Sequence, residues 1–221
     1  MRLLTYNVRS LRDDRAAAAR VVRACAPDAV CLQEAPRFPL QRWLLQRFAA
    51  ECGLRLACGG RAAHGPALLV RAGIPVDEAA AVRFRRTPGL HARGVAVARF
   101  GDVDVASVHL GLRPDERQRN AADVLAVLRS RGSGPWVVAG DLNEPPGGPA
   151  WAAFAEAGLR DACPEGGPTF PARRPARRID AVLVSPGLRV ARCIVPHDVV
   201  DGADLPVATD HLPVLAELDL P

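Results

Sequence analysis

Glycine and proline divide the chain into many short apolar runs, and this spacing limits the folds that it can adopt. Between residues 54 and 110, runs at 67–70, 79–84, 94–100 and 103–108 follow one another without a helical stretch. Apolar runs of this length between turn residues predict β-strands. Further runs of the same kind lie at residues 2–8, 29–32, 136–139, 179–184, 188–194 and 214–218.

Helical spacing of apolar residues occurs in few places. Asp13 or Asp14 can cap a helix over about residues 15–26, because a carboxylate there accepts the unpaired amide protons of the first turn. Proline is tolerated at the first helical position, and each of the other predicted helices begins at a proline. These begin at Pro39, Pro114 and Pro149.

So many strands with so few helices predict two stacked sheets, because one open sheet of that width would be hard to cover. We expect a four-layer α/β/β/α sandwich of two mixed β-sheets flanked by helices, formed as a single domain over residues 1–221. A doubly wound dinucleotide-binding fold fits less well, since no Gly-x-Gly-x-x-Gly follows the first strand. We expect Trp43 in the core, together with Trp136 and Trp151.

The charge balance permits an anionic partner without requiring one. The formal net charge is +5 and the isoelectric point is about 9.2, short of the basicity of an architectural DNA-binding protein. All 29 cationic side chains are arginine. Together with the abundant alanine, this favours codon bias over selected chemistry.

Cysteine use and the terminal sequence predict a reduced, soluble protein. The six cysteines include no Cys-x-x-Cys pair, so we expect neither a metal cluster nor a disulfide framework. The N-terminus lacks the pattern of a secretory leader, which makes the cytoplasm the expected compartment. No apolar run approaches the roughly 20 residues that cross a bilayer, and a monomer is favoured.

Polar side chains of chemical interest stand where apolar runs end. They are Asn7, Glu34, His109, Asp141 with Asn143, Asp180, and Asp210 with His211. A carboxylate beside buried surface is costly unless it is paired or binds a cation, and Mg²⁺ or Mn²⁺ prefers hard oxygen ligands. Glu34 is therefore a candidate metal ligand, and Asn7 could offer a carbonyl oxygen to the metal or an amide donor to a phosphate.

The sharpest motif is Val-Val-Ala-Gly-Asp-Leu-Asn at residues 137–143. Its strand carries Asp141 to the edge, and Gly140 allows the backbone to pass close to a ligand. Because side chains alternate along a strand, we expect Asn143 to point the same way as Asp141. A carboxylate and an amide would then face one reacting centre.

Two histidines complete the constellation. His109 ends another β run, where an imidazole can hydrogen-bond a phosphoryl oxygen or stabilise a departing one. His211 follows Asp210 in a tight loop, and Asp180 could accept its other ring proton and so select its tautomer.

At this point the motifs resemble those of the endonuclease/exonuclease/phosphatase superfamily, in order and spacing, over essentially the whole chain. They are Thr-Tyr-Asn-Val at 5–8, Leu-Gln-Glu at 32–34, Ser-Val-His-Leu at 107–110, Gly-Asp-Leu-Asn at 140–143, Arg-Ile-Asp at 178–180 and Thr-Asp-His at 209–211. The resemblance implies the four-layer sandwich and metal-dependent phosphoester hydrolysis. Members include deoxyribonuclease I, abasic-site endonucleases, neutral sphingomyelinases and inositol polyphosphate 5-phosphatases.

The resemblance also implies roles for single residues. Glu34 would be the principal Mg²⁺ ligand, with Asn7 and Asp210 close to the metal. Asp141 and Asn143 would position or activate the attacking water and hold the phosphate. His211, oriented by Asp180, is the other candidate base, and the sequence does not decide between it and Asp141.

Two positions depart from relatives. His109 stands where abasic-site endonucleases have tyrosine, which favours the deoxyribonuclease I and sphingomyelinase side of the family. Pro66 lies where many relatives carry an asparagine near the substrate, and proline has no amide to donate. His64 or Arg93 could compensate for that loss.

Arginines near the motifs are candidates for substrate binding. Arg93 could grip a phosphate through two nitrogens. Arg178 belongs to a cluster with Arg173, Arg174 and Arg177 that could follow a nucleic-acid backbone or could simply be a solvated loop.

The sequence therefore predicts a Mg²⁺-dependent phosphoester hydrolase, with Mn²⁺ as a possible substitute. A phosphodiesterase or nuclease is the leading hypothesis. The alternative is a phosphatase or phosphodiesterase acting on a phospholipid, sugar-phosphate or inositol-phosphate head group. A non-catalytic binding module of the same fold would be expected to lack a ligand or a base, and all eight positions are present.

Overall fold

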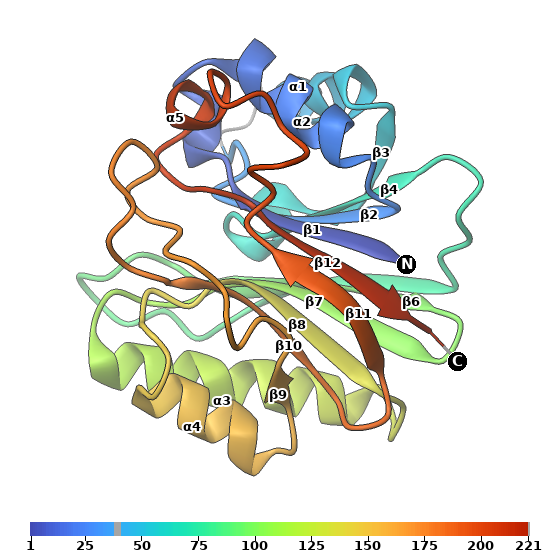
Figure 1. The fold of residues 1–221 in the computed structure, drawn as a ribbon. Coiled ribbons are helices and arrows are strands. Elements are labelled where there is room, and N and C mark those ends of the chain that lie inside the picture. Colours follow the sequence, from blue (N-terminus) through green and yellow to red (C-terminus); the bar gives the residue numbers. More distant parts are fainter. Residues whose placement is uncertain (38–40, 221) are drawn as a thin grey trace.

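The computed structural model describes residues 1–37 and 41–220, and its centre is a pair of stacked six-stranded β-sheets (Figure 1). The first sheet has the order β11-β12-β1-β2-β4-β3, and the second has the order β5-β6-β7-β8-β10-β9. Both sheets contain parallel and antiparallel pairs. The predicted sandwich of two mixed sheets is confirmed.

The strands fall close to the predicted apolar runs. In the first sheet they are β1 (Arg2–Asn7), β2 (Ala29–Gln33), β3 (Leu54–Gly59), β4 (Ala67–Arg71), β11 (Arg189–Ile194) and β12 (Val214–Asp219). In the second they are β5 (Glu78–Arg83), β6 (Gly94–Phe100), β7 (Val103–His109), β8 (Trp136–Asp141), β9 (Arg160–Asp161) and β10 (Asp180–Val184).

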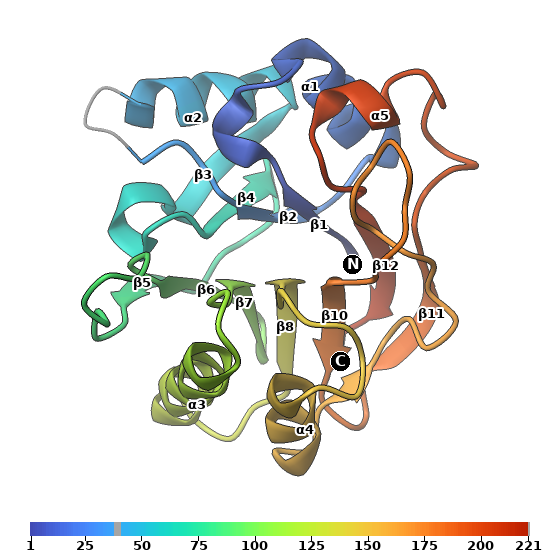
Figure 2. The same ribbon diagram turned by 90° about the vertical axis from the view of Figure 1, so that its left-hand side faces the viewer.

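Helices cover the outer face of each sheet (Figure 2). Over the first sheet lie α1 (Arg15–Cys25), α2 (Gln41–Glu51) and α5 (Leu205–Ala208), and over the second lie α3 (Pro114–Ser130) and α4 (Pro149–Glu156). Short 3-10 turns form η1 (Arg9–Leu11) and η2 (Gly60–Ala63). The structure selects Asp14 as the cap of α1, because its carboxylate accepts the Ala17 amide proton at 2.9 Å. The predicted start of α2 at Pro39 lies outside the described residues.

The alternation of side chains along the strands decides which residues face the gap between the sheets. In β1, Leu4 and Tyr6 pack toward the helices, whereas Leu3 packs against the second sheet. In β7, Val103 and Val105 face the gap. A side chain two residues further along a strand points the same way, so Asn7 and His109 both end up between the sheets.

The outer surface corrects one core prediction. Trp43 was predicted to be buried, but 62% of it is exposed, and the Arg47 guanidinium lies over its ring at 5.4 Å. Helix α2 turns Leu45 and Phe48 to the sheet instead. Trp151 is buried as expected and Trp136 is half-buried. Among the described residues, no helix combines the length and apolarity that a membrane crossing requires.

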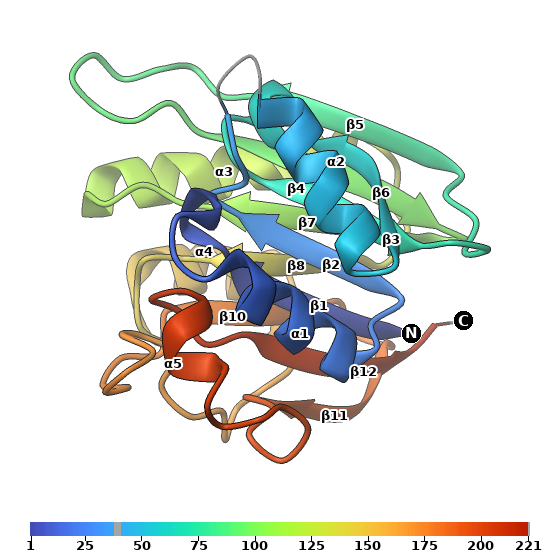
Figure 3. The same cartoon turned by 90° about the horizontal axis from the view of Figure 1, so that it is seen from above.

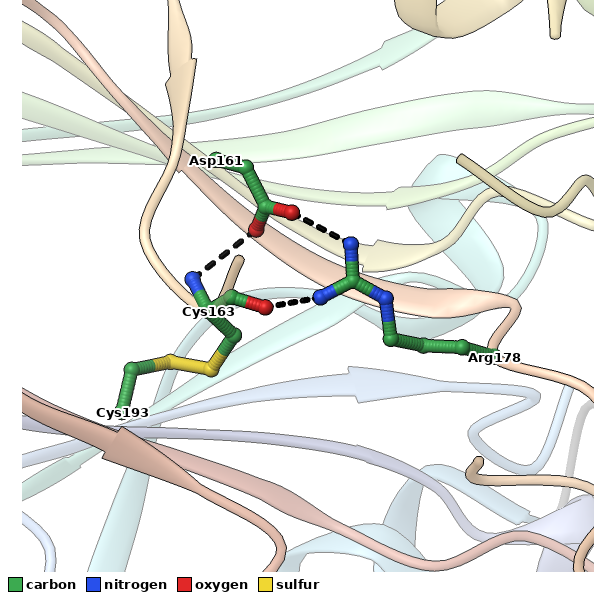
Figure 4. The surroundings of a disulfide bond; sticks show 4 residues. All are labelled: Asp161, Cys163, Arg178 and Cys193. Carbon is green, nitrogen blue, oxygen red and sulfur yellow. Dashed lines mark hydrogen bonds and ion pairs between the residues drawn. A yellow bond between two sulfur atoms is a disulfide. The ribbon is translucent and has the colours of Figure 1, made fainter. Parts of the chain in front are cut away.

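A second correction concerns the cysteines. Cys163 and Cys193 form a disulfide, with 5.1 Å between their Cα atoms (Figure 4). Cys163 follows β9 and Cys193 belongs to β11, so the bond joins the edge strands of the two sheets. The prediction of free thiols failed here because the two residues lie 30 positions apart in no recognisable motif. The free cysteines are Cys25, Cys31, Cys52 and Cys58, of which only Cys58 is partly exposed.

Candidate active site

The strand registers bring the predicted site residues into two facing rows (Figure 3 shows the sheets from above). In the second sheet, His109 of β7 is level with Asp141 of β8, and Asp141 is level with Asp180 of β10. In the first sheet, Asn7 is level with Gln33, the residue before Glu34. The parallel pairs β1–β2 and β7–β8 bring the last residues of those strands to the same end of each sheet, and the antiparallel strand β10 begins at that end with Asp180.

The Asn7 amide connects the two rows. Its Nδ2 donates to Asp141 Oδ2 at 3.0 Å and to Glu34 Oε1 at 3.3 Å, and its Oδ1 accepts the Arg9 amide proton at 3.1 Å. The Thr209 hydroxyl donates to the Asn7 carbonyl oxygen at 3.0 Å. This last bond ties the loop that carries Asp210 and His211 to the end of β1.

Asp141 lies at the centre of the cluster and is 1% exposed. Its Oδ1 accepts the Asn143 amide proton at 2.8 Å, and its Oδ2 lies 3.5 Å from His109 Nε2 and 3.8 Å from His211 Nε2. Burial and the neighbouring Asp180 raise the pKa of Asp141 to about 7, against the opposing effect of His211. A Cβ at position 140 would overlap the Val108 carbonyl oxygen, so glycine is required there.

His211 is held by a buried carboxylate. Its Nδ1 donates to Asp180 Oδ2 at 2.9 Å, which leaves Nε2 facing Asp141, as the sequence predicted. The Phe170 ring packs against the imidazole with a centroid separation of 4.8 Å. Burial alone would lower the pKa of His211, but Asp180 and Asp141 outweigh it and raise that pKa to about 9. The imidazole is therefore an imidazolium near neutral pH when no cation is bound.

His109 has a pKa that shifts in the opposite direction to that of His211. Burial lowers its pKa well below the ordinary value, and the charges of Arg93 and His211 act in the same direction. Its neutral ring can donate one hydrogen bond and accept another. The two pKa values shift in opposite directions because His211 makes a 2.9 Å hydrogen bond to Asp180, whereas His109 lies no closer than 3.5 Å to Asp141 and burial dominates.

Two of the predicted residues adopt unusual backbone conformations. Glu34 and Asn143 have φ angles of 50° and 53°, in the left-handed region that non-glycine residues seldom enter. Strand β8 ends at Asp141, so alternation does not orient Asn143 as we expected. Its Nδ2 donates instead to the Leu110 carbonyl oxygen at 2.9 Å.

The remaining predicted metal ligand, Asp210, lies at the rim of the cluster. Its Oδ2 is 3.5 Å from Arg9 Nε, and its Oδ1 lies 3.3 Å from the Thr209 hydroxyl oxygen, whose proton is better placed on the Asn7 carbonyl. About a third of its side chain is exposed, so this carboxylate meets solvent while Asp141 and Asp180 do not.

The centre has the donor set of a divalent-cation site. Asp141, Asp180 and His211 each offer a ligand atom within 4.8 Å of the others, and these three residues could hold a metal ion. The Asp180 Oδ1 atom is buried and accepts no hydrogen bond from the described residues. An unsatisfied carboxylate oxygen in such a position is costly unless a cation lies nearby.

Arg93 faces this cluster from the start of β6. It is 7% exposed, its Nε has no hydrogen-bond partner, and it forms no ion pair with a described carboxylate. Burial lowers its pKa, while Asp141, Glu116 and Glu34 act in the opposite direction. The structure therefore holds an unpaired guanidinium beside the carboxylates.

Arg178, the other predicted substrate ligand, is engaged elsewhere. Its guanidinium pairs with Asp161 and donates to the Cys163 carbonyl oxygen beside the disulfide (Figure 4), and it lies 5.2 Å from the Trp151 ring. These contacts use the donors that a phosphate would need. We correct the expectation and treat Arg178 as a structural residue.

A polar bridge below the site was not predicted. Gln33 Nε2 donates to the Thr5 hydroxyl at 3.1 Å, and the Ser107 hydroxyl donates across the gap to the Leu32 carbonyl oxygen at 2.8 Å. Thr5 and Ser107 precede Asn7 and His109 by two residues and so share their faces. This two-residue spacing could have predicted the hydrogen bonds. A polar side chain that points into the sandwich two residues before a site residue needs a buried hydrogen-bond partner.

Comparison with known proteins shows the family to which the chain belongs. The model of the Endonuclease/Exonuclease/phosphatase family matches residues 4–211. The chain belongs to this family. Its members are phosphoester hydrolases for which dependence on a metal is typical, so the expected class of enzyme is confirmed.

Solved structures share the fold along their whole length. A family member from Bacteroides vulgatus is 22% identical with a TM-score of 0.80, covering 100% of this chain and 98% of its own. The mannosyl-6-phosphatase of Bacteroides thetaiotaomicron is 20% identical (TM-score 0.79), and an AP endonuclease from Archaeoglobus fulgidus is 18% identical (TM-score 0.72), both with 100% of each chain covered. No curated protein sequence matches this chain.

Proposed function

We propose that the protein hydrolyses phosphate esters by attack of a water molecule at the centre around Asp141, and that the whole chain forms one catalytic domain. The observation that carries this proposal is the meeting of the hydrogen-bonded Asp180–His211 pair, the buried Asp141 carboxylate and the unpaired Arg93 guanidinium. The Asp141 carboxylate and the Arg93 guanidinium form no ion pair with each other, so a metal ion could pair with the first and a phosphate with the second.

For the metal we propose Mg²⁺, with Mn²⁺ as a substitute, held by Glu34 with Asn7 and Asp210. The alternative set is Asp141, Asp180 and His211, in which Asp180 Oδ1 and His211 Nε2 are available as ligand atoms. We prefer the first set because the hydrogen bond from His211 Nδ1 to Asp180 favours the protonated ring, and an imidazolium does not bind a metal. Asn7 would serve through Oδ1, which requires its amide to turn over. A bound divalent ion supplies charge neutralisation at the phosphoryl oxygens and a more acidic water.

Asp141 is the proposed base. The buried Asp141 carboxylate is an acceptor at the centre of the cluster, whereas the Nδ1 proton of His211 is committed to Asp180 and its Nε2 lies 3.8 Å from Asp141. In the metal-free protein, burial raises the pKa of Asp141 and the neighbouring carboxylates raise that of His211, which favours the same assignment. The His211 imidazolium, oriented by Asp180, would stabilise the negative charge that grows on the phosphoryl group. Neutral His109 and Arg93 would hydrogen-bond the other phosphoryl oxygens.

The proposed substrate is a phosphodiester, with nucleic acid as the leading class. Residues 35–101, which include Arg93 beside the centre, contain 11 arginines and 3 carboxylates, and this excess of cationic side chains supports a polyanion. A sugar-phosphate or another phosphorylated head group is the second candidate, because the mannosyl-6-phosphatase of Bacteroides thetaiotaomicron shares the fold over its full length.

The test is a substrate panel assayed with Mg²⁺, with Mn²⁺ and with chelator. It would contain plasmid DNA, an abasic duplex, RNA, a phospholipid, mannose 6-phosphate and bis(p-nitrophenyl) phosphate. We expect turnover that chelator abolishes, and Glu34→Ala and His211→Ala variants that stay folded but lose most of it. Retained turnover in chelator would contradict the metal-dependent mechanism.

We also propose a cytoplasmic monomer. The Cys163–Cys193 disulfide argues the other way, because disulfides are uncommon in reducing compartments. Counting free thiols in protein trapped rapidly from cells decides the compartment question, since a reduced cytoplasmic protein would show six.

A further inference from the structure

The edge of the sandwich opposite the disulfide contains a hollow that the proposed reaction does not use. It lies between α2, β3, η2 and β5, where the edge strands of the two sheets face each other (Figure 2). Its volume is about 590 Å³, within the range of small-molecule sites. We call it the edge hollow.

The lining of the edge hollow combines guanidinium groups with apolar surface. Arg42, Arg61 and Arg83 line it, and the described part of the lining contains no aspartate or glutamate. None of the three forms an ion pair with a described carboxylate. The Arg83 Nε donates to the Ala62 carbonyl oxygen at 3.3 Å, which fixes that side chain and leaves its terminal nitrogens available. The apolar part of the lining includes Leu45, Leu56, Ala57 and Ala81.

The charge around the edge hollow is unlike that of the rest of the molecule. Residues 35–101, which form α2 and strands β3 to β6, contain 11 arginines and 3 carboxylates, a net charge of +8. The other 154 residues contain 18 arginines and 21 carboxylates, a net charge of −3. The excess of positive charge in the sequence therefore lies in this stretch, although Arg71 and Arg99 pair with Asp28 and Asp104 outside it. Such an excess attracts anions.

We propose that the edge hollow is a second binding site, for a small molecule that joins an anionic group to an apolar body. The guanidinium groups would bind a phosphate, sulfonate or carboxylate through paired hydrogen bonds, and the apolar lining would cover the body. The site adjoins the catalytic centre: Pro36 lines the hollow and is two residues from Glu34, so their Cα atoms are at most ~7.6 Å apart. Ligand binding in the edge hollow does not depend on the proposed hydrolase activity.

The test uses two fluorescent probes that share one apolar body. These are 1-anilinonaphthalene-8-sulfonate and its uncharged analogue N-phenyl-1-naphthylamine, titrated into the wild-type protein in chelator. We expect the sulfonate to bind with one-to-one stoichiometry and about tenfold more tightly than the analogue, because only the sulfonate meets the arginines. Equal affinities, or several equivalent sites, would overturn the proposal.

Three variants locate the bound probe. Arg61→Glu reverses a charge in the lining, and Ala62→Trp fills the hollow from an exposed position. Arg55→Glu is the matched control, since it makes the same charge change on β3 outside the lining. We expect the first two to weaken sulfonate binding about tenfold or more and the control to change it less than about twofold. Circular dichroism checks that each variant is folded, and equal weakening by the control would overturn the site.

Cys58 gives an independent readout in the wild-type protein. It lines the hollow and is the free cysteine that is not buried. A bound sulfonate probe should slow its alkylation at least about threefold at saturating concentration, as peptide mapping would show. An unchanged rate at saturation would mean that the probe binds elsewhere. These experiments measure binding and not turnover. A negative result would therefore contradict the edge hollow without bearing on the proposed hydrolase, and an absence of hydrolase activity would not contradict the edge hollow.

Discussion

The proposed catalytic centre and the edge hollow differ in how most of their charged side chains are partnered, and the unpaired Arg93 is the exception in the centre. In the centre, Asp141, Asp180 and His211 are buried and lie within hydrogen-bonding distance of polar partners. In the hollow, Arg42 and Arg61 are exposed and have no carboxylate partner among the described residues. Hydrogen bonds between the side chains of the centre fix their arrangement, whereas guanidinium groups without a partner have N–H donors available for a ligand. Substitutions should therefore affect turnover strongly in the centre and binding alone in the hollow.

The largest effect is expected for Asp141→Asn. Turnover of the best substrate in the panel should fall about 10³-fold or more, because the amide cannot accept the proton of water. Since the pKa of buried Asp141 is about 7, above that of an unfolded aspartate, the ionised carboxylate destabilises the folded metal-free protein as pH rises through 7. The variant should therefore have a higher Tm than the wild type at pH 8 in chelator. Turnover within tenfold of wild type would remove Asp141 as the base.

Asp180→Asn should lower turnover by about 10²-fold, because the His211 imidazole loses its orienting partner. In the metal-free protein, NMR titration should show the His211 pKa fall from about 9 by more than one unit. A raised histidine pKa contributes stability that is complete below about 6.5 and lost as pH rises through 9. The variant should accordingly lose more stability at pH 6 than at pH 10. An unchanged His211 pKa would show that Asp180 does not hold it.

Arg93→Met should weaken catalysis by about 10- to 100-fold, mainly through KM, if this side chain binds the substrate phosphate. Removing a buried cation that has no partner should not lower Tm in the absence of substrate. The exposed Arg129→Met on α3 is a control for the change of charge, and it should leave both quantities unaltered. A lower Tm for Arg93→Met with unchanged KM would assign the arginine to the fold instead.

The smallest effect on turnover is expected for Arg61→Glu. Hydrolysis of bis(p-nitrophenyl) phosphate, whose single anionic group can occupy only one of the two sites, should change less than about twofold, because Arg61 is exposed and solvent and salt screen its charge. The same variant should lose the sulfonate probe. A large loss of turnover with this small substrate would make the hollow part of the centre and remove the contrast between them.

Much of the centre was predictable because strand geometry is simple. Asn7, His109 and Asp141 each end an apolar run at an inward position, and parallel strands bring such ends together. Glu34 could be predicted because it directly follows a buried strand. The fold followed from the same runs, since their number demanded two sheets.

The failures at Trp43 and Arg178 share one cause, which is that the sequence does not show what lies opposite a side chain, whereas the failure at Asn143 comes from the position of a strand end. Trp43 has helical spacing with core residues, yet α2 turns another face to the sheet. Arg178 looks like a free cation until Asp161 is placed beside it. Asn143 was oriented by strand alternation beyond the point at which the strand ends.

The bond between Cys163 and Cys193 turns the intervening chain into a covalent ring, and Asp180 is a member of that ring. A protease that cut once within residues 164–192 would open the ring without releasing either fragment. The nicked protein would migrate as one species on a denaturing gel until a thiol was added, and only then as two. The loop that leads to the His211 partner could thus be severed while the molecule stayed in one piece.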